Sequence, residues 1–204
     1  MLRGLVYKSA LIYEVTMTVA YGRHYGERYR AIADLIPAGA SVLDVCCGPG
    51  ILYQRYLREK GVSYTGLDMN EKFVRDVIRH GAEGRVHDLS SDEALPKADY
   101  VVMQASLYHF LPNAGPVVSR MVAAARAAVI IAEPIRNLST SSMRPLSWLA
   151  STMTNPSDGA PPQRFTEETL TDLFSQLELE PAKTFLLRGG RERVYVFPCQ
   201  AWQL

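Results

Sequence analysis

Short apolar runs alternate with amphipathic stretches along most of the chain, a pattern that is typical of an α/β protein. The apolar runs predict strands at residues 41–45, 63–67, 84–88, 99–104 and 128–132. Apolar residues at helical spacing predict intervening helices at 51–60, 71–79 and 117–127. Because strands that alternate with helices usually pair in parallel, we expect a largely parallel sheet with helices on both faces.

The two ends of the chain predict a further helical section and a hairpin. Residues from about 7 to 36 follow a helical pattern. Near the other end, Thr166 precedes two acidic residues and predicts the start of a helix. Two apolar runs at 182–187 and 192–198 then flank a glycine turn, which predicts two paired strands. No stretch has the composition of a linker, so residues 1–204 are expected to form one domain.

The stretch Ser41-Val-Leu-Asp-Val-Cys-Cys-Gly-Pro-Gly50 contains the strongest functional signal. A buried strand runs directly into a turn in which Gly48 and Gly50 allow sharp bends and the close approach of a ligand. The helix that follows points its amide-rich end towards this turn. We therefore expect a nucleotide-like ligand there.

The position of Asp44 distinguishes this turn from a dinucleotide-binding loop. A carboxylate inside the strand would repel a diphosphate and attract the ammonium group of a ligand. Tyr53 also stands where a dinucleotide fingerprint has its third glycine. A cationic ligand is favoured, while a nicotinamide-dependent oxidoreductase and a tight structural turn in another α/β protein remain alternatives.

The residues Val42-Leu-Asp-Val-Cys-Cys-Gly-Pro-Gly50 resemble the first motif of class I S-adenosylmethionine-dependent methyltransferases, including those of quinone biosynthesis. That family most often has glycine at the position of Cys46. The resemblance implies a three-layer αβα sandwich with a seven-stranded, mostly parallel sheet and an antiparallel last strand. It also implies S-adenosyl-L-methionine as the cofactor, in contact with Asp44, Cys46, Gly48 and Gly50.

Acidic residues also follow the next two predicted strands. Asp68 ends the second strand, where nucleoside-binding α/β folds place a carboxylate that accepts hydrogen bonds from ribose hydroxyls. Its alternative role is to cap the following helix. By resemblance to the family, Asp88 accepts a hydrogen bond from the adenine amino group and the Leu89 amide serves a ring nitrogen. Capping of the turn at Ser90 is the alternative for Asp88, and Met69 completes the expected cofactor contacts.

Residues after the fourth strand are expected to face the reaction cleft. Ligands of open α/β sheets bind beyond the carboxyl ends of the strands, where Gln104, Tyr108 and His109 lie. The run Ala105-Ser-Leu-Tyr-His-Phe-Leu111 resembles the fourth-strand motif of small-molecule methyltransferases. We expect Gln104 to contact the cofactor and Tyr108 to contact the acceptor. His109, with an ordinary pKa of about 6.5, is the candidate general base, and a structural histidine is the alternative.

Two segments are expected to cover the cleft. The first is a helical cap at about residues 1–38, in which Tyr21, Tyr25 and Tyr29 share one helix face. An aromatic stripe packed against the sheet is one explanation of this spacing. The resemblance implies instead a lid, with Tyr21 against the cofactor and Tyr25 against the acceptor.

The second covering segment is an inserted helix and loop at about residues 138–163. It contains Trp148, which we expect to contact the acceptor. Arg136 and Asn137 precede it at the end of the fifth strand and could bind acceptor oxygens, although a polar loop that caps nearby backbone is the alternative.

Composition narrows the partners further. A net charge of +1 with scattered Lys and Arg gives no electrostatic footprint for nucleic acid. Three cysteines, two of them adjacent, form neither a disulfide framework nor a spaced metal site, so we expect no metal and a reducing cytoplasm. No apolar stretch is long enough to span a bilayer. The chain is expected to act as a monomer or homodimer.

These features together predict an enzyme that transfers a methyl group from S-adenosylmethionine to a small acceptor. Apolar and aromatic residues in both covering segments favour a lipophilic or aromatic acceptor. Whether oxygen, nitrogen or carbon is methylated stays open. A non-catalytic protein that binds S-adenosylmethionine is the main alternative.

Overall fold

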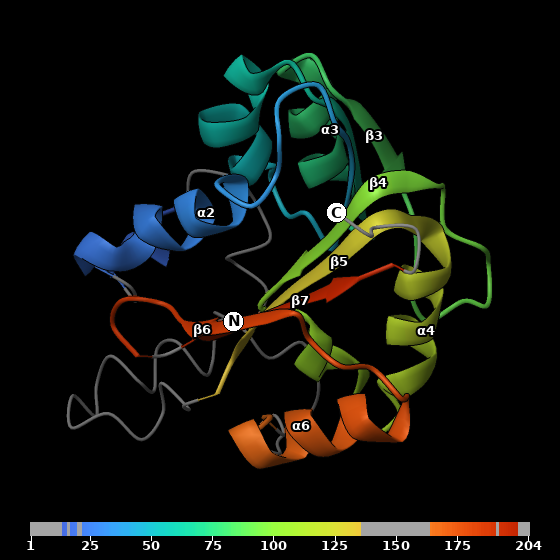
Figure 1. The fold of residues 1–204 in the computed structure, drawn as a ribbon. Helices are drawn as coiled ribbons and strands as arrows, with labels where there is room; N and C mark the ends of the chain where they lie inside the picture. The colour runs from blue at the N-terminus through green and yellow to red at the C-terminus, as the bar shows by residue number, and fades with distance from the viewer. Residues whose placement is uncertain (1–13, 16, 20–21, 136–163, 191, 200–204) are drawn as a thin grey trace, which may run out of the picture.

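Seven strands form one sheet in the structure, a computed structural model that describes residues 14–15, 17–19, 22–135, 164–190 and 192–199 (Figure 1). The strands are β1 (Ser41–Val45), β2 (Ser63–Asp68), β3 (Glu83–Val86), β4 (Ala98–Gln104), β5 (Ala125–Pro134), β6 (Lys183–Leu186) and β7 (Glu192–Pro198). Their spatial order is β3-β2-β1-β4-β5-β7-β6. Strands β1 to β5 pair in parallel, whereas β7 runs antiparallel to β5 and β6. The predicted sheet is confirmed.

Helices occupy the connections between the strands. The α-helices are α2 (Tyr25–Ala33), α3 (Glu71–Arg79), α4 (Gly115–Ala124) and α6 (Glu167–Gln176). Shorter helical elements are η2 (Gly22–His24), the π-helical turn η3 (Tyr53–Leu57), η4 (Arg58–Lys60) and η5 (Leu107–Phe110). As predicted, Thr166 caps α6, because its side chain accepts a hydrogen bond from the Thr169 amide.

Two apolar clusters, one on each face of the sheet, hold the layers together. One cluster joins the sheet to α2, η3 and α3 and includes Ile32 and Val77. The other joins it to α4 and α6 and includes Met121 and Phe174. Figure 1 shows these helices on opposite sides of the sheet. Burial of each such side chain contributes about 2 kcal/mol, so the predicted three-layer αβα sandwich is stabilised from both faces.

The structure corrects two predicted boundaries. The helix predicted at 117–127 ends at Ala124, and Ala125 begins β5 with an extended backbone (ψ 142°) and pairs with Ala98 of β4. An alanine-rich stretch can form a helix or a strand, and here its pairing with β4 makes residues 125–127 part of the strand. The third strand, predicted at 84–88, ends at Val86, so Asp88 lies beyond it.

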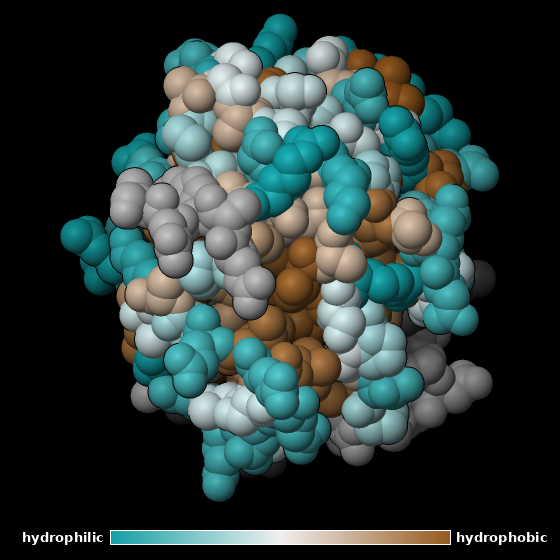
Figure 2. All heavy atoms as spheres, turned by 45° about the vertical axis from the view of Figure 1, so that its right-hand side comes forward, coloured by the Kyte–Doolittle hydropathy of each residue, from teal (hydrophilic) through white to brown (hydrophobic). Residues whose placement is uncertain are grey.

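Part of the second cluster reaches the surface. Val122, Leu173 and Leu177 are only partly buried where they pack against it. Figure 2, which turns the right-hand side of Figure 1 forward, shows hydrophobic residues gathered in a hollow that is bordered by hydrophilic residues. The described residues therefore present an apolar area on this face.

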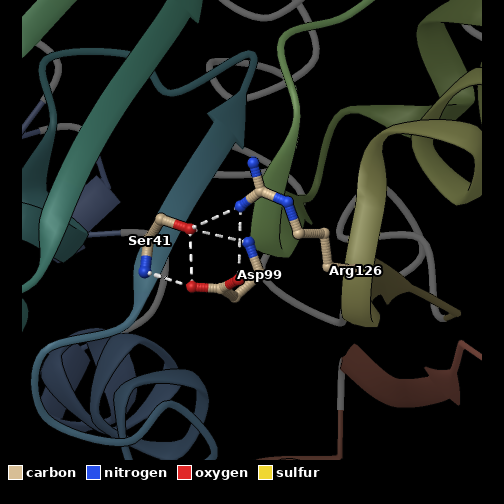
Figure 3. Close-up of polar contacts among 3 residues, drawn as sticks. All are labelled: Ser41, Asp99 and Arg126. Atoms are coloured by element: carbon tan, nitrogen blue, oxygen red, sulfur yellow. Dashed lines mark hydrogen bonds and ion pairs between the residues drawn. The ribbon is translucent and has the colours of Figure 1, made fainter. Parts of the chain in front are cut away.

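Polar side chains tie the amino ends of β1, β4 and β5 together (Figure 3). Asp99 Oδ2 accepts hydrogen bonds from the Ser41 amide at 2.9 Å and from Ser41 Oγ at 2.6 Å. The Asp99 amide in turn donates to Ser41 Oγ at 2.8 Å, and Arg126 Nη1 lies 3.3 Å from Asp99 Oδ1. These bonds fix the edge of the sheet opposite to the strands' carboxyl ends.

We predict that Asp99→Ala lowers the free energy of unfolding by about 1 kcal/mol at neutral pH, because two donors on Ser41 lose their acceptor. The hydrogen bonds from Ser41, helped by Arg126, hold the pKa of Asp99 below its usual range. The stabilisation is therefore fully present above the unfolded-state pKa of about 3.9 and is lost as pH falls through the folded-state pKa.

Urea unfolding of the wild type and Asp99→Ala at decreasing pH measures this effect. The two stabilities should converge in acid, and Asp99→Asn, which keeps an acceptor, should lie between them at neutral pH. A difference that does not change with pH would contradict the assignment.

Candidate functional site

The strand order reverses at β1, which lies between β2 and β4. The connection after β1 leads to one half of the sheet, and the connection after β3 returns the chain to the other half. In open α/β sheets this arrangement opens a crevice beyond the carboxyl ends of the strands. Apart from Tyr25, which lies in α2, the predicted cofactor and acceptor residues of the described ranges lie at or soon after these strand ends, so the topology places them at one edge of the sheet.

The loop after β1 adopts a backbone that favours glycine at three positions. Positive φ angles occur at Cys46 (58°), Gly48 (56°) and Gly50 (77°). A Cβ atom at Gly50 would lie 2.8 Å from Val77 Cγ2 of α3, so close packing also requires glycine there. Cys46 takes up the left-handed conformation despite its side chain, at the position where the resembled family most often has glycine. The loop therefore keeps its conformation although a non-glycine residue is strained in it. Backbone strain of this kind is common at ligand-binding sites.

Asp68 joins this loop to the end of β2. Its Oδ2 accepts a hydrogen bond from the Gly48 amide at 2.9 Å, and its Oδ1 accepts one from the Asn70 amide at 2.8 Å. Desolvation raises the pKa of Asp68, and these two hydrogen bonds oppose that rise. The cap of α3 is Asn70, whose side chain accepts from the Lys72 amide at 3.0 Å. The helix-cap role considered for Asp68 therefore belongs to Asn70.

Asp44 lies almost completely buried beside this loop, with 3% of its surface exposed. Tyr64 of β2 donates a hydrogen bond from its hydroxyl to Asp44 Oδ2 at 2.7 Å. Burial raises the pKa of Asp44, the Tyr64 hydrogen bond opposes this rise and the nearby Asp68 carboxylate adds to it, so that the pKa is about 7. The carboxylate would be stabilised by a cation, because its charge is poorly solvated.

The residues predicted to contact adenine occupy different environments. Asp88 is exposed, and its Oδ1 accepts a hydrogen bond from the Ser90 amide at 2.8 Å, which is the turn-capping contact considered above. Leu89 is buried. The side chain of Met69 is 73% exposed at the end of β2, an unusual position for a large apolar residue.

On the other side of β1, η5 follows the carboxyl end of β4. Gln104 Nε2 donates to the Arg28 carbonyl at 3.4 Å, which links β4 to α2. Tyr108 is buried, and the guanidinium carbon of Arg164 lies 3.3 Å from its ring centroid. His109 is exposed, with its ring centroid 4.0 Å from that of Tyr108. Desolvation of the part of the ring that packs against Tyr108, followed by the charge of Arg164, lowers the pKa of His109 to about 4, so the ring is neutral at physiological pH.

Glu133 was missed in the sequence because it looks like an ordinary residue at the exit of a strand. It is fully buried at the carboxyl end of β5. Its Oε2 accepts from the Leu107 amide at 3.0 Å and its Oε1 from the Tyr108 amide at 3.3 Å. Burial raises the pKa of Glu133 to about 8, against the effect of these hydrogen bonds. Glu133 therefore anchors η5 and orients Tyr108 and His109.

An ion pair between distant residues was also missed. Arg28 of α2 and Glu192 of β7 are both buried, with Arg28 Nη2 2.8 Å from Glu192 Oε1 and Arg28 Nε 3.1 Å from Glu192 Oε2. The sequence shows each residue as one charge among many. The pair fixes α2 against the hairpin next to Gln104.

The predicted covering residues fall into two groups. Tyr25 is buried and packs edge to face against Tyr29 with ring centroids 5.4 Å apart, in agreement with the aromatic packing explanation. Tyr21, Arg136, Asn137 and Trp148 lie outside the described residues. The lid and the insertion at 138–163 therefore remain predictions.

The described part of the chain contains no group of three or more His, Cys, Asp or Glu side chains that could hold a metal ion. None of its helices combines the length and the apolar character needed to cross a membrane.

Comparison with solved structures finds many proteins of the same fold. Magnesium protoporphyrin IX methyltransferase from Synechocystis PCC 6803, crystallised with S-adenosylhomocysteine, is 16% identical, with 94% of this chain and 95% of that chain covered and a TM-score of 0.68. A TehB-like methyltransferase from Corynebacterium glutamicum is 19% identical (84% and 86% covered, TM-score 0.60). An O-methyltransferase family 2 protein from Planctomyces limnophilus, in complex with apigenin, is 17% identical (91% and 61% covered, TM-score 0.64).

Comparison with curated proteins gives no match. The profile of a protein family, described as methionine biosynthesis protein MetW, matches residues 26–164, which is more than half of the chain. This range contains β1 to β5 and the loop after β1. The chain therefore belongs to the MetW family and has the fold of class I S-adenosylmethionine-dependent methyltransferases, as the resemblance of its first motif predicted.

Proposed function

We propose that the protein binds S-adenosyl-L-methionine beyond the carboxyl ends of β1 to β3 and transfers its methyl group to a small acceptor beside η5. One observation carries the proposal: two desolvated carboxylates, Asp44 and Asp68, lie at the ends of adjacent strands around a glycine loop. The structural neighbour from Synechocystis, which was crystallised with S-adenosylmethionine and with S-adenosylhomocysteine, supports this choice of ligand.

Asp44 suits the amino-acid end of the ligand. A buried carboxylate with Tyr64 as hydrogen-bond donor is poorly neutralised, and an ammonium group at the loop would supply the missing positive charge. A diphosphate would instead bring more negative charge next to Asp44 and Asp68, which disfavours a nicotinamide dinucleotide. Cys46, Gly48 and Gly50 would provide backbone close to the ligand.

Asp68 suits the ribose hydroxyls. Each of its oxygens accepts one backbone hydrogen bond and retains a second lone pair for a hydroxyl donor. Met69, next to it and largely exposed, would cover one face of the adenine ring. Asp88 and the Leu89 amide complete the proposed adenine contacts, which requires Asp88 to exchange or share its turn-capping hydrogen bond.

Methyl transfer from a sulfonium requires mainly alignment of the nucleophile with the methyl carbon, because the leaving group is a neutral thioether. Glu133 would keep η5 in place, Tyr108 and His109 would line the acceptor side, and Gln104 would contact the cofactor. When the acceptor is a hydroxyl, neutral His109 would receive its proton. A lipophilic or aromatic acceptor fits the prediction that Trp148 helps to enclose it. We further propose a cytoplasmic location and a monomer or homodimer.

We predict that Asp68→Ala weakens the binding of S-adenosylhomocysteine by more than tenfold, which corresponds to about 1.4 kcal/mol. The reason is the loss of the ribose hydrogen bonds and of the support given to Gly48. Isothermal titration calorimetry measures the affinity, and thermal unfolding shows whether the variant is folded. Asp172→Ala, which removes an exposed carboxylate on α6, is the matched control and should bind as the wild type does. Unchanged affinity in Asp68→Ala would remove the ribose assignment.

We also predict that incubation of a cell extract with the protein and S-adenosylmethionine yields a product that gains one methyl group by mass spectrometry. His109→Ala should reduce its formation while S-adenosylhomocysteine binds normally, because His109 acts on the acceptor. With its lowered pKa, His109 stays neutral and the rate that depends on it falls only towards pH 4. Binding of the cofactor without any methylated product would favour the non-catalytic alternative.

A further inference from the structure

We propose that the acceptor carries a carboxylate and that Arg164 binds it. This inference rests on the methyl-transfer site proposed above and names the class of its acceptor. The geometry that carries it is the position of Arg164 over Tyr108, beside His109 and at the carboxyl end of β4.

Arg164 is distant in sequence from Tyr108, but the fold brings the two side chains together. Arg164 lies just before α6 and is half-buried, and its guanidinium covers the ring of Tyr108 with 3.3 Å between guanidinium carbon and ring centroid. Part of the guanidinium also hydrogen-bonds the Tyr108 side chain, and its other N–H groups can donate to a ligand. Tyr108 is part of η5, which the proposed reaction places next to the acceptor. Arg164 therefore presents donors at the acceptor side.

The carboxylates near Arg164 are engaged elsewhere. Both oxygens of Glu133 accept backbone hydrogen bonds from η5. Glu192 pairs with Arg28, and Glu167 lies 3.0 Å from Arg193. Across the described ranges, no carboxylate lies within ion-pair distance of Arg164.

The residues outside the described ranges include few acidic side chains that could pair with Arg164. Outside the described ranges, Asp158 is the only acidic side chain, whereas the same stretch, 136–163, also contains Arg136 and Arg144. The charge of Arg164 favours ionised Glu133, but burial of Glu133 outweighs it and raises the pKa of this carboxyl to about 8. A half-buried arginine with an aromatic partner and no ion-paired carboxylate among the described residues suits an anionic ligand.

A carboxylate fits this site better than other anions of the same charge. The planar guanidinium fork donates two parallel hydrogen bonds to a carboxylate, which fixes the orientation of the bound molecule as well as its charge. Such an anchor next to Tyr108 would hold the reacting atom of the acceptor near His109. Arg164 would thus select acids over their neutral analogues.

The test compares acids with their amides on the protein saturated with S-adenosylhomocysteine. The probes are benzoate and benzamide, 4-hydroxybenzoate and 4-hydroxybenzamide, indole-3-acetate and indole-3-acetamide, and octanoate and octanamide, with affinities from ligand-observed NMR. We expect at least one acid to bind about tenfold more tightly than its amide. The preference should disappear in Arg164→Gln and persist in part in Arg164→Lys, which retains the charge. Arg79→Gln, which changes an exposed arginine of α3, is the matched control and should keep the preference.

Two outcomes would overturn the inference: no acid preferred over its amide in the wild type, or a preference that survives in Arg164→Gln. Loss of the stacking on Tyr108 alone would change thermal stability without changing the ratio of acid to amide affinity. If S-adenosylhomocysteine itself does not bind, the proposed function fails, and the same panel on the protein alone still decides whether Arg164 selects acids.

Discussion

The carboxylate of Asp44 is buried near the end of the central strand β1, and neighbouring residues hold it in this position. Its hydrogen bond comes from Tyr64 of the adjacent strand, whose own ring stacks on Tyr53 with centroids 4.8 Å apart. Burial of a carboxylate without a cation costs free energy, which is why its pKa rises to about 7 and the protonated form competes at neutral pH. A cationic ligand beside Asp44 would therefore stabilise its ionised form, and the strand order puts Asp44 at the switch point of the sheet.

The loops after β1 and β4 contain strained backbone that nearby hydrogen bonds stabilise. Among the described residues, only Cys46, Ala105 and Glu178 are non-glycine residues with positive φ, and the first two directly follow β1 and β4. Unfavourable backbone of this kind persists where neighbouring contacts over-determine it. Asp68 supplies such contacts on the β1 side and Glu133 on the β4 side, each by accepting two backbone hydrogen bonds. In each half of the proposed site, a carboxylate thus holds the loop by accepting hydrogen bonds from backbone amides.

Most of the sheet could be predicted because buried parallel strands leave continuous apolar runs in the sequence, and β1 leads directly into a glycine turn. Asp44 and Asp68 were proposed as site residues for the same reason, since each lies in or at the end of such a run. Glu133 could not be recognised, because its role depends on a segment about 25 residues away that only the fold brings near. The end of β3 was misplaced because this edge strand has no fully buried residue to mark its limits.

The proton balance of ligand binding tests the role of Asp44 most directly. If an ammonium group binds beside Asp44, the pKa of Asp44 must fall on binding. Because Asp44 is mostly protonated at about pH 6 in the free protein, the wild type should release close to one proton at this pH when it binds S-adenosylhomocysteine. Calorimetry in buffers of different ionisation enthalpy measures this number, and Asp44→Asn should release none. Equal proton release by the two proteins, or heats that do not depend on the buffer, would contradict the account.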